Sequence, residues 1–280
     1  MTDKDSFRRP APRPSHAQPA RAVQSAQSAQ PVRPVQPAHP ADTLRLAKRV
    51  AELFSCSRRE AEQYVEGGWI MVDGIVVEES GARIGAAQSI VLLPDATLAP
   101  IEPVTLLFHK PAGVESLGDL TPALAFITPE SRLIDDRSGQ RFLHKHLRDL
   151  TLATPLGKVA SGLVVLTQDF RVARKLVDDA TRIEHEYVVE VAGTMIADGL
   201  ALLNAGIPMP GRPPGAVKVS WQNETRLRFA AKALKTGHVT LMCEAVGMQV
   251  KSMRRIRVGR LAMAGLPSGH WRYLLGYERF

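Results

Sequence analysis

One short stretch, from Ser57 to Val77, limits the fold more than any other part of the sequence. Ser57-Arg58-Arg59-Glu60 has the pattern of a capping box, in which the serine accepts from an early helix N–H and the glutamate reaches back. Gly67-Gly68 provides a stop for that helix. Asp73-Gly74 then follows between two apolar runs, and this pair favours a type I′ turn in a β-hairpin. A capped helix closely followed by a tight hairpin predicts a small α+β module.

The flanking sequence sets the limits of this module. Before it, apolar side chains recur at helical spacing, at Leu44, Leu46, Val50, Ala51 and Phe54. A further strand is expected from Ser89 to Leu93, and Pro100 and Pro103 mark a boundary. We therefore expect one compact module over residues 41–100 and a second domain over residues 101–280.

The second domain mixes short apolar runs with longer amphipathic stretches, which predicts both strands and helices. Strands are expected at Val104–Phe108, Leu163–Thr167, Tyr187–Val191, Val217–Trp221 and Val250–Val258. Helices are expected at Phe170–Ala180, Ile196–Asn204 and Val239–Val246. Gly247 provides the stop for the last of these helices.

Residues 1–40 differ in composition from the rest of the chain. They are rich in Pro, Ala, Gln and Ser, with six Lys or Arg, two acids and almost no large apolar groups. Such a segment cannot bury enough surface to offset the entropy of ordering, so we expect a disordered basic tail. The tail could be a solubilising extension, or its arginines could touch phosphates without specificity.

Charge and composition restrict the class of partner. The net charge of +8 favours polyanions, nucleic acid above all. The sequence contains no run of about 18 apolar residues, and we expect no signal peptide because residues 1–40 contain no apolar stretch. The two cysteines, Cys56 and Cys243, lack metal-ligand spacing, and no Gly-rich phosphate loop is present. We expect a cytoplasmic protein with no membrane association, no metal and no small-molecule cofactor.

Three motifs, Leu44–Ala51, Ser57–Ala61 and Val72–Gly74, carry a resemblance to the S4-type RNA-binding domain. The resemblance implies four RNA contacts, at Arg45, Lys48, Arg58 and Arg59. Arginine in the first turn of a helix suits phosphate, because free backbone N–H groups and the guanidinium fork both donate there. The module has six basic and nine acidic residues, a net charge of −3. Its cations must therefore gather on one face to bind RNA.

Three motifs of the second domain, Leu106–Gly113, Met242–Gly247 and Leu266–Arg272, are similar to bacterial pseudouridine synthases that carry an N-terminal S4-type domain. That family isomerises uridine to pseudouridine in ribosomal RNA. The resemblance implies an α+β fold class, in which the S4-type module precedes a domain with a central, mainly antiparallel sheet. It also implies RNA contacts by Lys110 and by two arginines on one face of a strand, Arg255 and Arg257.

The stretch Thr154–Thr167 departs from this family at its most important position. It aligns without a gap with the family pattern Gly-Arg-Leu-Asp followed by Gly-Leu, so that Leu156 and Gly162-Leu163 match. The family's catalytic aspartate then falls on Gly157, and its arginine falls on Pro155. The reaction breaks a C–N glycosidic bond and rejoins the base through carbon, for which a carboxylate serves as nucleophile or base. Since glycine has no side chain, we expect impaired catalysis.

Other positions of the family site are partly kept. Tyr187 matches the tyrosine that the family stacks against its target base. The family's late basic run aligns with Lys235–Met242, where one position of four keeps a basic charge. Other acids lie outside the loop that the chemistry requires, at Asp135, Asp136, Asp149 and Asp169.

Three functions remain open at this point. The first is a binding protein that grips structured RNA, ribosomal RNA in the first instance, on a pseudouridine synthase scaffold without modifying it. The second is an active synthase that uses another acid. The third is a ribosome-assembly or regulatory factor whose second domain docks a protein partner. Tyr187 and Lys110 favour the first two, whereas the decayed basic run favours the third.

Overall fold

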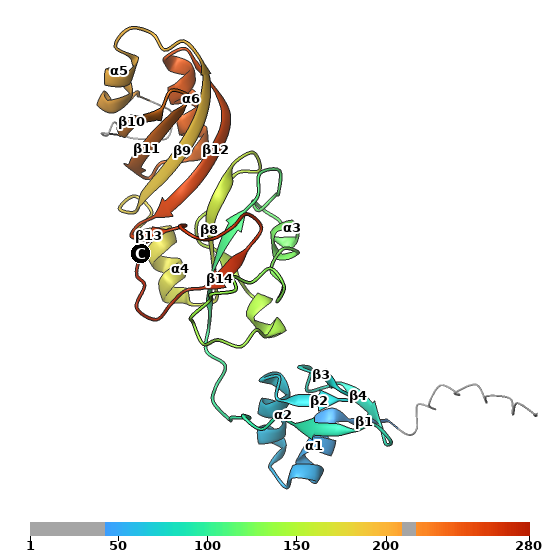
Figure 1. Cartoon of the computed structure of the whole chain (residues 1–280). Helices are drawn as coiled ribbons and strands as arrows, with labels where there is room; N and C mark the ends of the chain where they lie inside the picture. The colour runs from blue at the N-terminus through green and yellow to red at the C-terminus, as the bar shows by residue number, and fades with distance from the viewer. Residues whose placement is uncertain (1–42, 209–216) are drawn as a thin grey trace, which may run out of the picture. The chain divides into compact units, whose positions relative to one another are not determined.

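The computed structural model describes residues 43–208 and 217–280 (Figure 1). The tail expected over residues 1–40 lies outside these ranges. Within them, no helix combines the length and the apolar character needed to cross a membrane.

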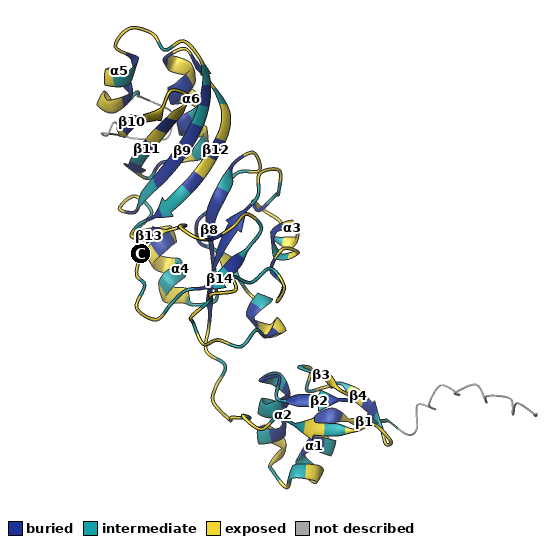
Figure 2. Ribbon diagram, viewed as in Figure 1, coloured by how far each residue is buried: buried dark blue, intermediate teal, exposed yellow. Residues whose placement is uncertain are grey.

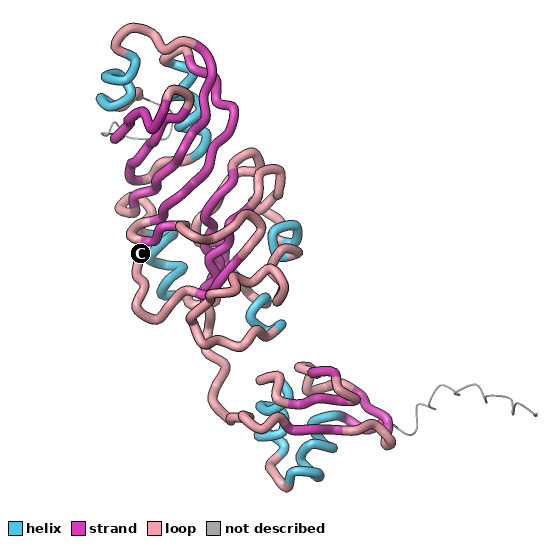
Figure 3. Tube along the Cα trace, viewed as in Figure 1, coloured by secondary structure: helices cyan, strands magenta, loops and turns pink. Residues whose placement is uncertain are grey.

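The first module consists of two helices and two small sheets (Figure 3). Its elements are β1 Thr43–Arg45, α1 Leu46–Phe54, α2 Arg58–Glu66, β2 Ile70–Val72, β3 Ile75–Val76, β4 Arg83–Gly85 and β5 Ile90–Leu92. Strands β1 and β4 pair with each other, and β3, β2 and β5 form the second sheet. Helices and strands share one core, which buries Leu46, Val50, Ala61, Val65 and Ile70 completely.

The local signals of this module are confirmed. Ser57 Oγ accepts from the Glu60 N–H at 3.2 Å, and the Glu60 carboxylate accepts from the Ser57 N–H at 2.7 Å. Asp73 and Gly74 have φ angles of 49° and 84°, the left-handed pair that a type I′ turn requires. One detail differs, because Arg45 ends strand β1 and is not part of the first helix.

The second domain is built on a nine-stranded sheet. Its elements are β6 Thr105–Lys110, α3 Thr121–Leu124, the 3-10 helix η2 His144–Leu147, β7 Thr151–Leu152, β8 Ser161–Thr167, α4 Phe170–Asp178, β9 Glu184–Gly193, α5 Gly199–Ala205, β10 Lys218–Asn223, β11 Arg226–Lys232, α6 Thr236–Ala245, β12 Met248–Val258, β13 Leu261–Ala262 and β14 Trp271–Tyr273. The main strand order is β10-β11-β9-β12-β8-β6-β14. The strand pairs are antiparallel except for β12 with β8, which confirms the expected mainly antiparallel sheet.

The parallel junction between β8 and β12 depends on Gly162. This residue has φ +117°, and a Cβ placed on it would lie 2.2 Å from the carbonyl oxygen of Arg255. Backbone therefore approaches backbone at a distance that leaves no room for a side chain. The glycine at position 162 therefore allows β8 and β12 to pair, and so joins the two halves of the sheet.

The two faces of the sheet are covered differently. Helices α5 and α6 pack against one face, where a large core includes Tyr187, Phe229 and Met242. Helix α4 and the segment around β13 cover the opposite face of the other half, where Leu163, Val165 and Leu176 are buried (Figures 1 and 2). The central strands β6 and β8 are buried on both faces, as their continuous apolar runs indicate.

A β-bulge in β12 corrects one expectation. Arg255 pairs with Tyr187 on β9, and Arg257 pairs with the adjacent Glu186, so Ile256 is the extra residue between them. Neighbouring residues of β9 point to opposite faces, and their partners on β12 do the same. The expectation that Arg255 and Arg257 lie on one face is therefore wrong, because simple alternation along the strand does not hold through a bulge.

Candidate functional site

Basic side chains of the first module meet in one concavity. A cavity of about 250 Å³ is lined by Arg45, Lys48, Arg58 and Arg83, which we call the cationic cleft. Three of these cations were expected from the sequence, and Arg83 was not. The cleft also contains one acid, Glu62, whose carboxylate pairs with Arg58 at 3.0 Å. The net negative charge of the module therefore does not extend into this cleft.

The strand pairing places two of these cations against each other. Arg45 on β1 is directly opposite Arg83 on β4. Like charges at directly opposed positions destabilise a pair of strands, and an anion bound between them would relieve that repulsion. Phosphate oxygens fit this requirement, because arginine presents a planar fork of donors to them. Arg59 lies in the first turn of α2 and is exposed, but it does not line the cleft.

In the second domain, the loop that precedes β8 is fixed from below by Arg255. This guanidinium is 1% exposed. It donates to the carbonyl oxygens of Thr154, Pro155 and Leu163, at 2.6, 3.0 and 2.7 Å. Burial lowers the pKa of Arg255, and the neighbouring Tyr187 side chain partly offsets this change. The side chain therefore holds the loop at Gly157 in place and does not reach solvent.

Lys110 supports the same loop from the other side. Its ammonium is buried and donates to the carbonyl oxygens of Pro111, Val114 and Lys158, at 3.0, 2.9 and 3.3 Å. Burial lowers the pKa of Lys110 to about 8, and Glu115 opposes that change. Lys110 and Arg255 were both expected to contact RNA. Because both side chains are buried, neither charge can reach a phosphate. Both instead donate hydrogen bonds to backbone carbonyl oxygens of the loop.

Tyr187 also lies beneath the surface. Its ring is 1% exposed, and its hydroxyl donates to the carbonyl oxygen of Leu234 at 3.1 Å. The ring of His185 lies beside it, with centroids 6.4 Å apart. Burial and the charge of Arg255 lower the pKa of His185 to about 4, so this imidazole is neutral. Tyr187 thus belongs to the buried floor of the site and not to an open pocket.

Gly157 lies in the loop that these buried side chains support, at a position with room for a side chain. A Cβ built at Gly157 would have one neighbour within 4 Å among the described residues, Thr236 Oγ1 at 3.6 Å. Its φ lies outside the left-handed range, so other residue types can adopt the same backbone. The position could therefore accommodate an aspartate. As the chain stands, no described carboxylate lies within that distance of the built atom.

The other acids that the sequence offered as substitutes for the missing aspartate either bind neighbouring groups or are exposed to solvent. Asp136 is bound by Arg132 at 2.8 Å and by the Tyr273 N–H at 3.2 Å. Asp169 caps α4 by accepting from the Arg171 N–H. Two more are exposed, Asp135 and Asp149.

Glu115 is an acid near the loop that sequence reasoning missed. Its own segment is attached to the Gly157 loop, because Ser116 Oγ donates to the Leu156 carbonyl at 3.0 Å and the Gly113 N–H donates to the Lys158 carbonyl at 2.8 Å. Backbone N–H groups of Leu117 and Ser116 lower the pKa of Glu115. The residue carries no sequence signal, since only the folded loops bring it there.

Arg257 is neutralised by two acids. It forms ion pairs with Glu184 and with Glu186, and the latter also pairs with Arg228. The side chain of Arg257 is 28% exposed. A role for this residue in RNA contact stays a prediction. Among residues 43–208 and 217–280, no group of His, Cys, Asp and Glu has the arrangement of a metal site.

The comparison with known proteins agrees with the fold described above. The S4 domain family matches residues 44–89. A solved structure, "Crystal structure of pseudouridylate synthase", aligns with 82% of this chain and 96% of its own, with a TM-score of 0.51 and 22% identity. The chain is an S4 domain followed by a pseudouridine synthase fold. Both parts of the expected fold are thereby confirmed.

Sequence relatives extend over both parts. The chain is 25% identical over 248 residues to the dual-specificity RNA pseudouridine synthase RluF of Escherichia coli strain K12. The aligned region covers 84% of this chain and 77% of that relative. It is 28% identical over 244 residues to the ribosomal large subunit pseudouridine synthase B of Bacillus subtilis strain 168, which covers 84% and 93%. The resemblance to pseudouridine synthases is therefore confirmed, with the S4 domain in the same chain.

Proposed function

We propose that this chain binds structured RNA, ribosomal RNA in the first instance, on a pseudouridine synthase scaffold that does not isomerise uridine. The binding half of the proposal is supported by the cationic cleft, where Arg45 and Arg83 lie directly opposite each other. Directly opposed cations favour a polyanionic partner. Relatives named as RNA pseudouridine synthases make RNA the polyanion to test first.

The single observation that carries the absence of catalysis is Gly157. The position that the resemblance assigns to the catalytic aspartate has open space, and Thr236 Oγ1 is the neighbour at 3.6 Å. The supporting groups are retained beneath it, since Arg255, Lys110 and Tyr187 are buried and hydrogen-bonded. Loss of one nucleophile from such a constellation costs many orders of magnitude in rate.

Restoring the missing groups tests this explanation. Gly157→Asp fits the backbone, and Pro155→Arg returns the arginine that would keep the new carboxylate ionised. We expect the double variant to gain pseudouridine formation on ribosomal RNA, measured by chemical mapping, while the unmodified chain forms none. Gly157→Asn with Pro155→Arg is the matched control, because it has the same shape without the charge. Equal product from the unmodified chain and the double variant would contradict the proposal.

The alternative is an active synthase with a different acid, and one observation favours it. The segment of Glu115 is hydrogen-bonded to the Gly157 loop, and its carboxylate is ionised. If the unmodified chain makes pseudouridine and Glu115→Gln abolishes the product, the alternative holds. A role in ribosome assembly or in docking a protein partner is a third candidate, and it predicts RNA binding with no product from any of these variants.

A further inference from the structure

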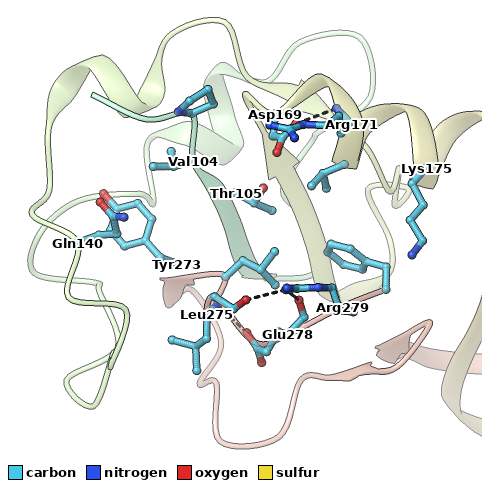
Figure 4. A pocket seen from close by; sticks show the side chains of 15 residues that line it. Val104, Thr105, Gln140, Asp169, Arg171, Lys175, Tyr273, Leu275, Glu278 and Arg279 are labelled. Atoms are coloured by element: carbon cyan, nitrogen blue, oxygen red, sulfur yellow. Dashed lines mark hydrogen bonds and ion pairs between the residues drawn. The ribbon is translucent and has the colours of Figure 1, made fainter. Parts of the chain in front are cut away.

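A second cavity lies in the pseudouridine synthase fold, away from the loop at Gly157. It has a volume of about 500 Å³ and lies between the start of β6, helix α4 and the segment that follows β14 (Figure 4). Ligand sites commonly have volumes of about 300–1,000 Å³. Neither Gly157 nor Tyr187 lines this cavity, so it is separate from the site described above.

Three cations line this cavity. Arg171 and Lys175 lie one turn apart on α4, and Arg279 comes from the C-terminal segment. Figure 4 shows Arg171 near the start of α4, with Lys175 later on the same helix, and both lie across the cavity from Gln140. Like charges four residues apart destabilise a helix, and a third cation from another segment adds to the repulsion. An anion in the cavity would remove this cost.

The acids at the cavity pair with one of these cations and leave Lys175 and Arg279 without an acidic partner among the described residues. The carboxylate of Glu278 is held by Arg272, with two contacts of 2.7 Å. Asp169 caps α4 and also forms an ion pair with Arg171, whose Nε lies 3.5 Å from the carboxylate. Arg279 donates to backbone carbonyl oxygens, and no acid among the described residues pairs with Lys175. The cavity therefore keeps an excess of positive charge.

Apolar and neutral polar groups complete the lining. Phe280 lines the cavity while packing in part against the core beneath α4, and it remains partly exposed; Val104 and Leu275 also line the cavity. Gln140 has an exposed carboxamide that can both donate and accept at the edge of a base. Aromatic stacking together with arginine or lysine is how proteins hold single-stranded nucleic acid.

We propose that this cavity binds an unpaired nucleotide of an RNA strand. Lys175 and Arg171 hold the phosphate, the base lies on Phe280, and Gln140 contacts the edge of the base. The inference rests on the proposed RNA-binding function and adds a second contact site to it. An acidic protein segment would satisfy the cations but would not require the aromatic face.

The first test uses the full chain and two probes, a single-stranded oligouridine and a structured ribosomal RNA hairpin. Arg171→Glu with Lys175→Glu is expected to weaken oligouridine binding at least tenfold. The slope of log K against log salt should also fall by about 1.4, since two contacts to a single strand are lost. Arg174→Glu is the matched control, because this residue lies on the same helix and pairs with Asp178 outside the cavity.

The second test locates the bound nucleotide directly. Oligouridine that contains 4-thiouridine is crosslinked by light to the full chain, and the crosslinked peptides are identified by mass spectrometry. We expect crosslinks in residues 273–280. Phe280→Ala and Gln140→Ala should each reduce them, and neither variant changes the charge of α4 or of the cationic cleft. Crosslinks confined to other segments, or oligouridine affinity unchanged in the double variant, would overturn the proposal.

The two proposals fail in different ways. If the cavity variants behave as the unmodified chain while hairpin binding depends on the cationic cleft, only the cavity proposal is refuted. If neither probe binds the unmodified chain at low salt, the proposed RNA-binding function fails as well. Binding of an acidic peptide that competes with oligouridine at Lys175, with no dependence on Phe280, would replace the RNA strand by a protein partner.

Discussion

We predict that neutralising the cationic cleft weakens RNA binding without lowering the stability of the free protein. The change is Lys48→Gln together with Arg83→Gln. Both side chains are exposed in the cleft, and neither is paired with an acid among the described residues. Arg83 also lies directly opposite Arg45, so its removal relieves a repulsion in the free protein.

The size of the effect follows from the number of phosphate contacts removed. Each contact to duplex contributes about 0.9 to the slope of log K against log salt, so two contacts contribute about 1.8. Between 50 and 200 mM salt the logarithm of concentration changes by about 0.6, so the affinity ratio of the two proteins should itself change about tenfold over that range. The melting temperature of the double variant should be no lower than that of the unmodified chain.

Filter binding of a structured ribosomal RNA fragment at several salt concentrations measures the slope, and calorimetry measures the melting temperature. Arg49→Gln is the matched control, since Arg49 lies on the same helix as Lys48, pairs with Glu52 and does not line the cleft. An unchanged slope in a folded double variant would refute the assigned binding face. A marked fall in melting temperature would instead show that these side chains serve the fold.

Three further predictions concern the rest of the molecule. Arg58→Glu with Arg59→Glu should weaken binding of structured RNA and flatten its salt dependence, which the same titrations would detect. Gly162→Ala should destabilise the second domain by about 3 kcal/mol or more in urea unfolding, because its Cβ would lie 2.2 Å from the Arg255 carbonyl oxygen; a loss below 1 kcal/mol would contradict the close approach. Burial lowers the pKa of His185 from 6.5 to about 4. The unfolded chain therefore binds this proton at a higher pH than the folded chain does. The free energy of unfolding should fall by about 3 kcal/mol as the pH is lowered from 6.5 through 4. His185→Gln should flatten that part of the stability profile, and an unchanged profile would contradict the assignment.

Local signals in the sequence predicted the first module well. The capping box at Ser57 and the turn at Asp73-Gly74 act over a few residues, so a reader of the sequence can recognise them. Strands β1 and β4 were missed because they are short and because their pairing joins residues far apart in the chain. The same pairing brings Arg83 into the cleft, which no local pattern could indicate.

The candidate site was predictable in its position but not in its exposure. Motif spacing placed Gly157 in the loop before β8, and the structure has it there. Lys110 and Arg255 were expected to contact RNA because they match family positions, yet both are buried and donate to backbone carbonyl oxygens. Burial is set by the packing of distant segments, and the bulge in β12 that separates Arg255 from Arg257 has no signature in the sequence.

The most direct test of a scaffold that binds RNA without modifying it uses the unmodified chain. Purified protein is incubated with ribosomal RNA from a strain that lacks this protein. The bound RNA is recovered by crosslinking, and pseudouridine is then mapped in the recovered fragments. We predict recovery of specific fragments that depends on the cationic cleft, with no new pseudouridine in them. New pseudouridine at a defined uridine, lost on Glu115→Gln, would contradict the account and establish an active synthase.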